Sequence, residues 1–124
     1  MNTPPPIDFR TRFRAVLESY LANPALTVDL LADELELSRR HLLRRCDDAF
    51  GISPSQLIRM TRLERAHALL GSGRCPSVAH AARSVGMAPA YFSRSYSARF
   101  GQTARETLLN ARRVAKNDSD GTNR

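Results

Sequence analysis

Two arginines fifty residues apart, Arg44 and Arg94, occupy the same place in a sequence pattern that the chain carries twice. A guanidinium group can donate two hydrogen bonds to O6 and N7 of guanine, a contact worth about 1–3 kcal/mol of base discrimination. The same group can instead bind a DNA phosphate, or pair with a carboxylate of its own chain such as Asp47 or Glu64. The two arginines therefore favour nucleic-acid recognition, with base contact, phosphate contact and internal pairing all open.

The repeated pattern aligns residues 28–51 with residues 78–101. Besides the two arginines, four residues recur unchanged, in the pairs Val28 and Val78, Ala32 and Ala82, Phe50 and Phe100, and Gly51 and Gly101. Three apolar positions keep their character, in the pairs Leu35 and Val85, Leu37 and Met87, and Leu42 and Phe92. Each copy predicts a short helix, a tight turn and a second helix, which is the helix-turn-helix layout that enters a DNA groove.

Helical spacing of apolar residues and good capping residues extend this prediction to the whole chain. Seven helices are expected, over residues 8–22, 28–35, 39–49, 54–71, 78–84, 89–99 and 103–113. No stretch shows the alternation of a strand, so the predicted fold class is all-α.

The predicted organisation is two helix-turn-helix subdomains, residues 8–52 and 72–115, joined by a linker helix over residues 53–71. The Pro-rich lead, residues 1–7, and the polar tail, residues 116–124, are expected to be disordered because neither can bury apolar surface.

One face of each second helix is predicted to face solvent and DNA. In the first copy Leu42 and Cys46 should pack inward, because residues four apart share a helix face. The base contacts predicted on the outward faces are Arg40, Leu43 and Arg44 in the first copy and Ala90, Ser93 and Arg94 in the second. Outward Leu43 would meet a thymine methyl group or be partly buried against the linker helix. The small residues of the second copy allow close approach to the bases and offer few groups for specificity.

Contacts to the DNA backbone are predicted from other residues. Three serines precede predicted helices, where free N–H groups and the helix dipole favour a phosphate. Arginines on the linker helix would extend the basic surface, although one or two of them should pair with Glu64 or with helix ends. The predicted backbone contacts are Ser38, Arg39, Ser53, Arg59, Arg62 and Ser77.

The charge distribution agrees with a surface that faces phosphates. The net charge of the chain is +7. Residues 39–115 hold fourteen arginines against four acidic residues, a net charge of +10. A GC-rich genome would also favour arginine, since Lys116 is the single lysine. Composition alone, however, would not place arginines at matching positions of a repeat.

Other function classes find little support in the sequence. The spacing of Cys46 and Cys75 fits neither a zinc site nor a disulfide scaffold, so buried, reduced thiols are expected. The three histidines, His41, His67 and His80, fall on different predicted helices without a catalytic partner. We therefore expect no enzyme activity, metal or cofactor. No signal peptide and no long apolar segment is present, which predicts a cytoplasmic, nucleoid-associated protein without membrane contact.

These motifs resemble the DNA-binding domain of the AraC/XylS family over about residues 9–113. The segments that carry the resemblance are Ser38-Arg39-Arg40-His41-Leu42, Ser53-Pro54-Ser55-Gln56-Leu57-Ile58-Arg59, Val85-Gly86-Met87 and Tyr91-Phe92-Ser93-Arg94. The resemblance implies seven helices, with both recognition helices in successive major-groove segments of double-stranded DNA. It also implies transcription regulation, often activation through contact with RNA polymerase, and it places the base contacts at the six positions predicted above.

The chain departs from the family pattern at three places. Glu36 stands where the first turn usually has glycine, so it adopts the turn at a conformational cost or the turn differs. Cys46 stands where an aromatic residue is usual, and Thr103-Ala104 replaces the usual Ser-Pro.

The sequence leaves three classes of function open. The first is a sequence-specific regulator, which would be either a short regulator complete in itself or the output domain of a longer protein whose sensing part is absent. A basic protein that binds nucleic acid without sequence preference would carry a similar charge. A helical module that binds only proteins is the third alternative. No region is large enough for an effector pocket of its own, so no small-molecule ligand is expected.

Overall fold

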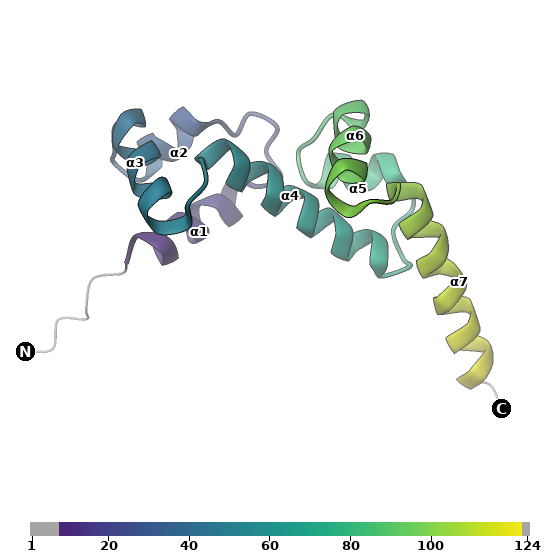
Figure 1. Cartoon of the computed structure of the whole chain (residues 1–124). Helices are drawn as coiled ribbons and strands as arrows, with labels where there is room; N and C mark the ends of the chain where they lie inside the picture. Colours follow the sequence, from purple (N-terminus) through teal and green to yellow (C-terminus); the bar gives the residue numbers. More distant parts are fainter. Residues whose placement is uncertain (1–7, 123–124) are drawn as a thin grey trace, which may run out of the picture. The chain divides into compact units, whose positions relative to one another are not determined.

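The computed structural model describes the backbone of residues 8–122 and the side chains of residues 8–117. Within these residues the chain forms seven α-helices and no strand, which confirms the all-α prediction (Figure 1). The helices are α1 (Phe9–Tyr20), α2 (Val28–Glu34), α3 (Arg39–Phe50), α4 (Pro54–Gly71), α5 (Val78–Ser84), α6 (Pro89–Phe100) and α7 (Ala104–Thr122). The Pro-rich lead, residues 1–7, lies outside the described residues.

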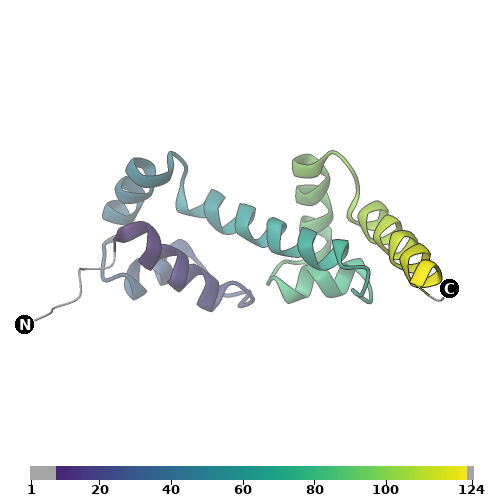
Figure 2. The ribbon, with the colours of Figure 1, turned by 90° about the horizontal axis from the view of Figure 1, so that it is seen from below.

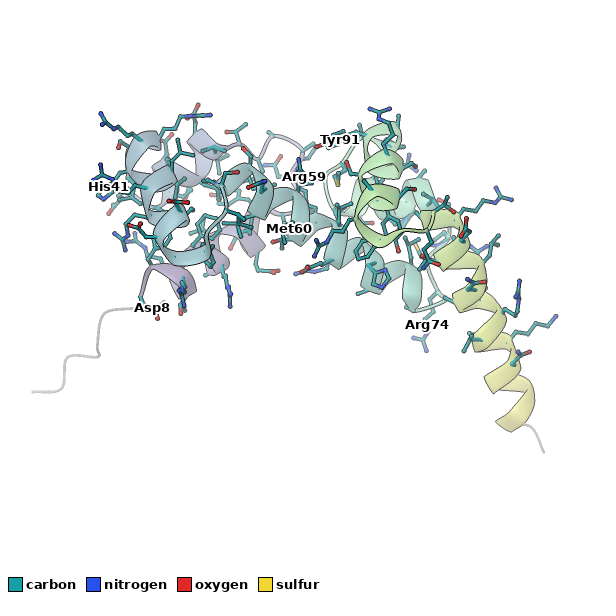
Figure 3. All side chains as sticks on the ribbon, viewed as in Figure 1. Asp8, His41, Arg59, Met60, Arg74 and Tyr91 are labelled. Carbon is teal, nitrogen blue, oxygen red and sulfur yellow. The ribbon has the colours of Figure 1, made fainter. Side chains whose placement is uncertain are left out.

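The chain divides into two compact units, Met1–Arg59 and Met60–Arg124. The boundary falls inside α4, between Arg59 and Met60, which are both labelled in Figure 3. Each unit therefore contains one helix-turn-helix pair, α2 with α3 or α5 with α6, and a part of the linker helix.

Capping side chains fix where most helices begin. The hydroxyl groups of Thr27, Ser38 and Ser77 accept hydrogen bonds from the N–H groups of Leu30, His41 and His80, at 3.1, 3.1 and 3.0 Å. These are the caps that the sequence predicted for α2, α3 and α5. Each cap satisfies one of the N–H groups that a helix leaves without an internal partner, which is worth about 1 kcal/mol.

In the first unit, α1 packs on α2 and α3, as Figures 1 and 2 show. Phe13, Leu31 and Leu42 are at most 1% exposed and form the centre of this core. Phe50, the last residue of α3, lies 5.4 Å from Phe13 between ring centroids. Phe50 thus packs the end of α3 against the core, and Gly51 ends the helix in the left-handed C-cap conformation.

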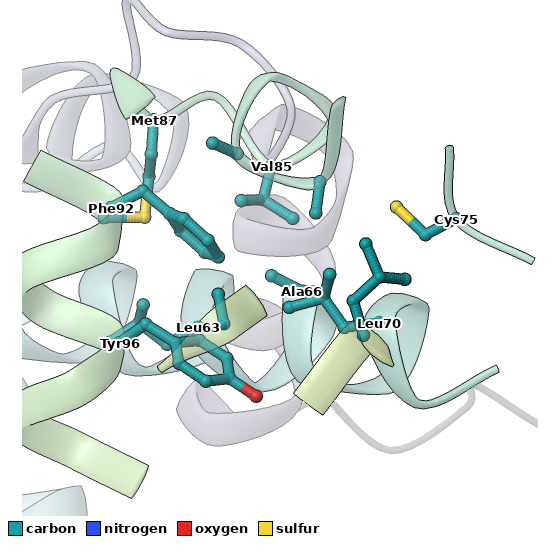
Figure 4. Close-up of a cluster of buried hydrophobic side chains, with 12 residues drawn as sticks. Leu63, Ala66, Leu70, Cys75, Val85, Met87, Phe92 and Tyr96 are labelled. Atoms are coloured by element: carbon teal, nitrogen blue, oxygen red, sulfur yellow. The ribbon is translucent and has the colours of Figure 1, made fainter. Parts of the chain in front are cut away.

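In the second unit, α5 and α6 pack on α7 and on the second part of α4 (Figure 4). Leu63 and Leu70 of α4 meet Val85, Phe92 and Tyr96, and all five are at most 2% exposed. Burial of such side chains contributes about 1.5–3 kcal/mol each. This core holds α6 with its opposite face free.

The two tight turns have the same geometry although their sequences differ. Glu36 has φ +59° and Gly86 has φ +75°, both in the left-handed region. The residue after each turn donates to the same helix position, Leu37 to Ala32 O and Met87 to Ala82 O, both at 2.9 Å. The first turn is therefore not built differently, and Glu36 bears the conformational cost.

The last helix is longer than the sequence predicted. An end near residue 113 and a disordered tail from residue 116 were expected, but α7 continues to Thr122. Polarity suggested the end, yet no glycine or proline stands between Ala104 and Asp120 to break a helix.

Candidate nucleic-acid interface

The outward face of α3 carries the three side chains that the sequence placed there. Arg40, Leu43 and Arg44 are exposed, while Leu42 and Cys46 on the opposite face are fully buried. Leu43 is 40% exposed, which is unusual for leucine in a small domain. The helix thus presents two guanidinium groups and one apolar side chain to solvent on one face.

The outward face of α6 has the matching arrangement. Ala90, Ser93 and Arg94 are exposed, whereas Phe92 and Tyr96 are fully buried. Pro89 begins the helix, and Ala88 before it offers no capping side chain. The first N–H groups of α6 are therefore not occupied by a side-chain cap.

Arg44 and Arg94 make no hydrogen bond or ion pair with the described part of the chain. Internal pairing with Glu64 was one alternative for Arg94, but Glu64 is bound by Arg99, with 2.7 Å between Oε1 and Nη2. Asp47 makes no ion pair with Arg44 either, so both guanidinium groups remain available to a ligand.

Two further residues of the recognition helices were missed by sequence reasoning. His41 and Tyr91 are the third residues of α3 and α6, and both are exposed, Tyr91 at 45% (Figure 3). Their positions differ by fifty, so the repeat could have identified them.

The predicted backbone contacts differ in how free their groups are. Ser53 and Gln56 form a reciprocal pair, since Gln56 N donates to Ser53 Oγ at 3.2 Å and Ser53 N donates to Gln56 Oε1 at 3.1 Å. The Ser53 hydroxyl also lies 3.3 Å from Gln56 Oε1 as a donor. Ser38 and Ser77 accept cap hydrogen bonds and keep their hydroxyl hydrogens. Phosphate contact by the three serines stays a prediction.

The three arginines that were predicted to contact phosphates differ in their exposure and in their ion pairs. Arg39 pairs with Asp29 at 3.0 Å, and both side chains are more than half exposed. Arg59 is exposed on α4 (Figure 3). Arg62 is only 9% exposed, and burial lowers the pKa of its guanidinium group. A buried guanidinium is not available to a phosphate, so the structure argues against the predicted contact of Arg62.

The two units differ in net charge. Residues 1–59 hold eight arginines and eight acidic residues and are neutral overall. Residues 60–124 hold ten arginines and one lysine against four acidic residues, which accounts for the whole net charge of +7. In the first unit positive charge is local, since Arg39, Arg40 and Arg44 lie in the first half of α3. Positive charge therefore accompanies both recognition helices. In the first unit it lies on α3 itself, and in the second it comes from the net charge of the whole unit.

The thiols of this chain are packed side chains. Cys46 is fully buried, and burial raises its pKa to about 11. Because the thiolate is the reactive and metal-binding form, Cys46 is inert at neutral pH. Cys75 is 6% exposed, and its Sγ donates to Ser77 O at 3.2 Å.

One histidine belongs to a hydrogen-bond chain in the second unit that leads from exposed His67 to buried Tyr96 and Thr107. His67 stacks on Phe100, with 4.4 Å between ring centroids, and its Nδ1 lies 2.7 Å from Tyr96 Oη. Tyr96 Oη donates to Thr107 Oγ1 at 2.9 Å, and Thr107 Oγ1 donates to Thr103 O at 3.3 Å. Tyr96 Oη therefore joins His67 Nδ1 and Thr107 Oγ1 in one chain of hydrogen bonds. His67 is exposed and also stacks on Phe100, so it combines the surface and packing roles expected for it.

The described residues bring together no group of three or more His, Cys, Asp or Glu side chains that could hold a metal ion. Within residues 8–122, no helix combines the length and apolar character needed to cross a bilayer.

Comparisons with known proteins agree with this geometry. Residues 31–110 match a family model described as a helix-turn-helix domain. The chain is similar to the structure of a probable AraC family transcriptional regulator from Rhodopseudomonas palustris, with 32% identity, 82% of this chain and 97% of that chain covered, and a TM-score of 0.66. It is also similar to a DNA-binding transcriptional dual regulator from Escherichia coli K-12, with 25% identity, 90% and 99% covered, and a TM-score of 0.75.

A third structure shows the same fold at lower identity. It is the DNA-binding domain of the global transcriptional factor AdpA in complex with a target DNA, at 23% identity, with 87% of this chain and 96% of that chain covered and a TM-score of 0.78. A search of curated proteins gives no significant match.

Proposed function

This chain belongs to the AraC-type helix-turn-helix family of DNA-binding transcription regulators, and we propose that it regulates transcription by recognising a specific sequence in double-stranded DNA. The observation that carries the proposal is the equivalence of Arg44 and Arg94, which are exposed and unpaired within the described chain at matching positions of two recognition helices. A surface that bound DNA by charge alone would not need this repetition.

In the proposed mechanism α3 and α6 each enter a segment of the major groove. Arg44 and Arg94 donate to O6 and N7 of guanine, in the geometry that distinguishes guanine from other bases. Neither arginine must first give up an internal ion pair, so the contact costs only desolvation and side-chain ordering.

The two helices contribute unequally to specificity. On α3, Arg40 adds a second donor and Leu43 provides an apolar contact for a thymine methyl group. On α6, Ala90 and Ser93 are small, so Arg94 is the main specificity determinant there. We therefore propose that the first unit selects more base positions than the second.

Contacts to phosphates position both helices without selecting a sequence. We propose this role for Ser38, Arg39, Ser53, Arg59 and Ser77, four of which lie at or beside helix N-termini. Arg39 would exchange its exposed partner Asp29 for a phosphate at little cost, because exposed ion pairs contribute about 0–1 kcal/mol.

Selection of random duplex DNA by the purified chain, followed by sequencing of the bound pool, tests the proposal. We expect a bipartite motif with its halves about one helical turn, roughly 10 base pairs, apart. A pool without any sequence preference would contradict the proposal and favour binding driven by charge alone.

We also propose three finer points of function. Activation through contact with RNA polymerase, localisation to the nucleoid and the absence of a small-molecule effector follow from the resemblance and from the size of the chain. In vitro transcription from a promoter that carries the selected motif would separate activation from repression.

A further inference from the structure

A groove of about 570 Å³ lies within the second unit, beside the outward face of α6. It is bordered by α6, by α7 and by the segment that leads into α5. Its lining residues include Ser77, Ser93, Ser97, Arg105, Leu109 and Arg112. Ser93 is one of the proposed base contacts and Ser77 one of the proposed phosphate contacts, so the groove joins two parts of the proposed interface.

The charge of the groove is one-sided. Arg105 and Arg112 contribute two guanidinium groups, and no acidic residue is among the described residues that line it. Arg112 donates from Nη2 to Cys75 O at 2.9 Å and to Pro76 O at 2.8 Å, which attaches α7 to the segment before α5. Arg105 is exposed and makes no hydrogen bond or ion pair with any described residue. Arg112 therefore forms a wall of the groove, and Arg105 is the cation available to a ligand.

The offset of fifty residues also relates the start of α7 to the start of α4, where it aligns Arg105 with Ser55. The same offset aligns Leu109 of α7 with Arg59 of α4 as equivalent positions. Arg59 is a proposed phosphate contact, yet leucine cannot fill that role. Arg105 lies four residues before Leu109 and hence on the same face of α7, one turn earlier. The second unit thus keeps a cation on the equivalent helix face, displaced by one turn.

We propose that Arg105 binds a phosphate of the DNA strand flanking the site contacted by α6, and that this groove holds the strand. The inference rests on the proposed function, since it requires α6 to lie on DNA. An acidic protein segment would also suit two arginines. DNA is favoured because the same groove is lined by Ser93, which lies on the proposed base-contacting face.

Measuring affinity against salt concentration for Arg105→Ala tests the proposal, with Arg113→Ala as the matched control. Arg113 is an exposed arginine of the same helix that does not line the groove. Each lost phosphate contact should reduce the magnitude of the negative slope of log K against log salt by about 0.9. We expect this decrease for Arg105→Ala and a slope like that of the wild type for Arg113→Ala. Equal slopes for the two variants would overturn the proposal.

A second measurement locates the phosphate. Single methylphosphonate substitutions, which remove one phosphate charge, are placed through the flank of the α6 half-site. One substitution should weaken wild-type binding at least threefold and leave Arg105→Ala unaffected. If every substitution weakens both proteins equally, Arg105 does not contact the backbone.

Failure of the inference can be distinguished from failure of the proposed function. Wild-type preference for the selected duplex over a scrambled one tests the function alone. The slopes of the two variants are measurable on either duplex, so they test Arg105 even where no preference exists.

Discussion

Glu36 and Gly86 occupy the same position in the two helix-turn-helix turns, and both have a left-handed backbone, with φ of +59° and +75°. Among the described residues Glu36 is the one non-glycine residue with positive φ. A residue with a Cβ atom bears about 1–2 kcal/mol of strain in this region, whereas glycine adopts it freely. The first turn is therefore strained, and the second is not.

Replacing Glu36 by glycine should stabilise the protein. The relief of strain is partly offset by the larger entropy of glycine in the unfolded chain, so the expected gain is about 0.5–1 kcal/mol. The lost ion pair with Arg12 counts little, since its atoms are 3.9 Å apart and the Glu36 side chain is 85% exposed. Urea denaturation measures the change. A loss of stability in Glu36→Gly would contradict the account of the turn.

The reverse change gives the matching control. Gly86→Ala should destabilise the second unit by about 1–2 kcal/mol, because its φ of +75° disfavours any Cβ atom. Unchanged stability in this variant would show that the turn relaxes without cost.

Removing the Tyr96 hydroxyl group should weaken the second unit. Tyr96→Phe breaks the hydrogen bonds to His67 and Thr107, at an expected cost of about 1–2 kcal/mol. Thr107→Val removes the hydrogen bond between Tyr96 and Thr107 from the threonine side. Thermal unfolding of both single variants and the double variant should give a coupling energy of at least 0.5 kcal/mol. Additive effects would mean that the two hydroxyl groups do not act as one network.

The stability of the protein should fall at alkaline pH in a way that depends on Cys46. Burial raises the pKa of this thiol from 9.0 to about 11, so the folded state favours the protonated form. Its contribution is fully present below about pH 9 and is lost as pH rises toward about 11, where the unfolded thiol ionises first. The unfolding free energies measured at pH 8 and at pH 10.5 should therefore differ less from each other in Cys46→Ala than in the wild type. An identical pH dependence in both proteins would refute the assignment.

Substitution of Arg59 should reduce DNA affinity without changing sequence preference. Phosphate contacts carry no base information, so Arg59→Ala should weaken binding to selected and scrambled duplexes by the same factor. Fluorescence anisotropy titrations with both duplexes measure this ratio. A larger loss on the selected duplex would instead assign Arg59 to base recognition.

The sequence predicted what depends on periodicity and on the repeat. Buried Leu42 and Phe92 and exposed Arg44 and Arg94 follow from helix faces and from their matching positions. Burial of Arg62 could not be predicted in the same way, because spacing alone does not distinguish an arginine under neighbouring segments from one on a free surface. The length of α7 was missed because polarity was given more weight than the absence of helix breakers.

The groove beside α6 could not be predicted from the sequence, because it depends on how the helices pack. The groove forms where the segment before α5 meets α6 and α7, and this packing brings Arg105 to the same groove as Ser93. The matching positions of His41 and Tyr91, by contrast, follow from the repeat, because the two residues are fifty positions apart.

The central claim is that two equivalent arginines, one on each recognition helix, contact bases in two separate half-sites. Parallel selection of random duplex DNA by the wild type, Arg44→Ala and Arg94→Ala tests it most directly. Each variant should lose preference at one base position, and the two positions should lie about one helical turn apart. Unchanged motifs in both variants, or an equal weakening at every position, would contradict base recognition by these residues.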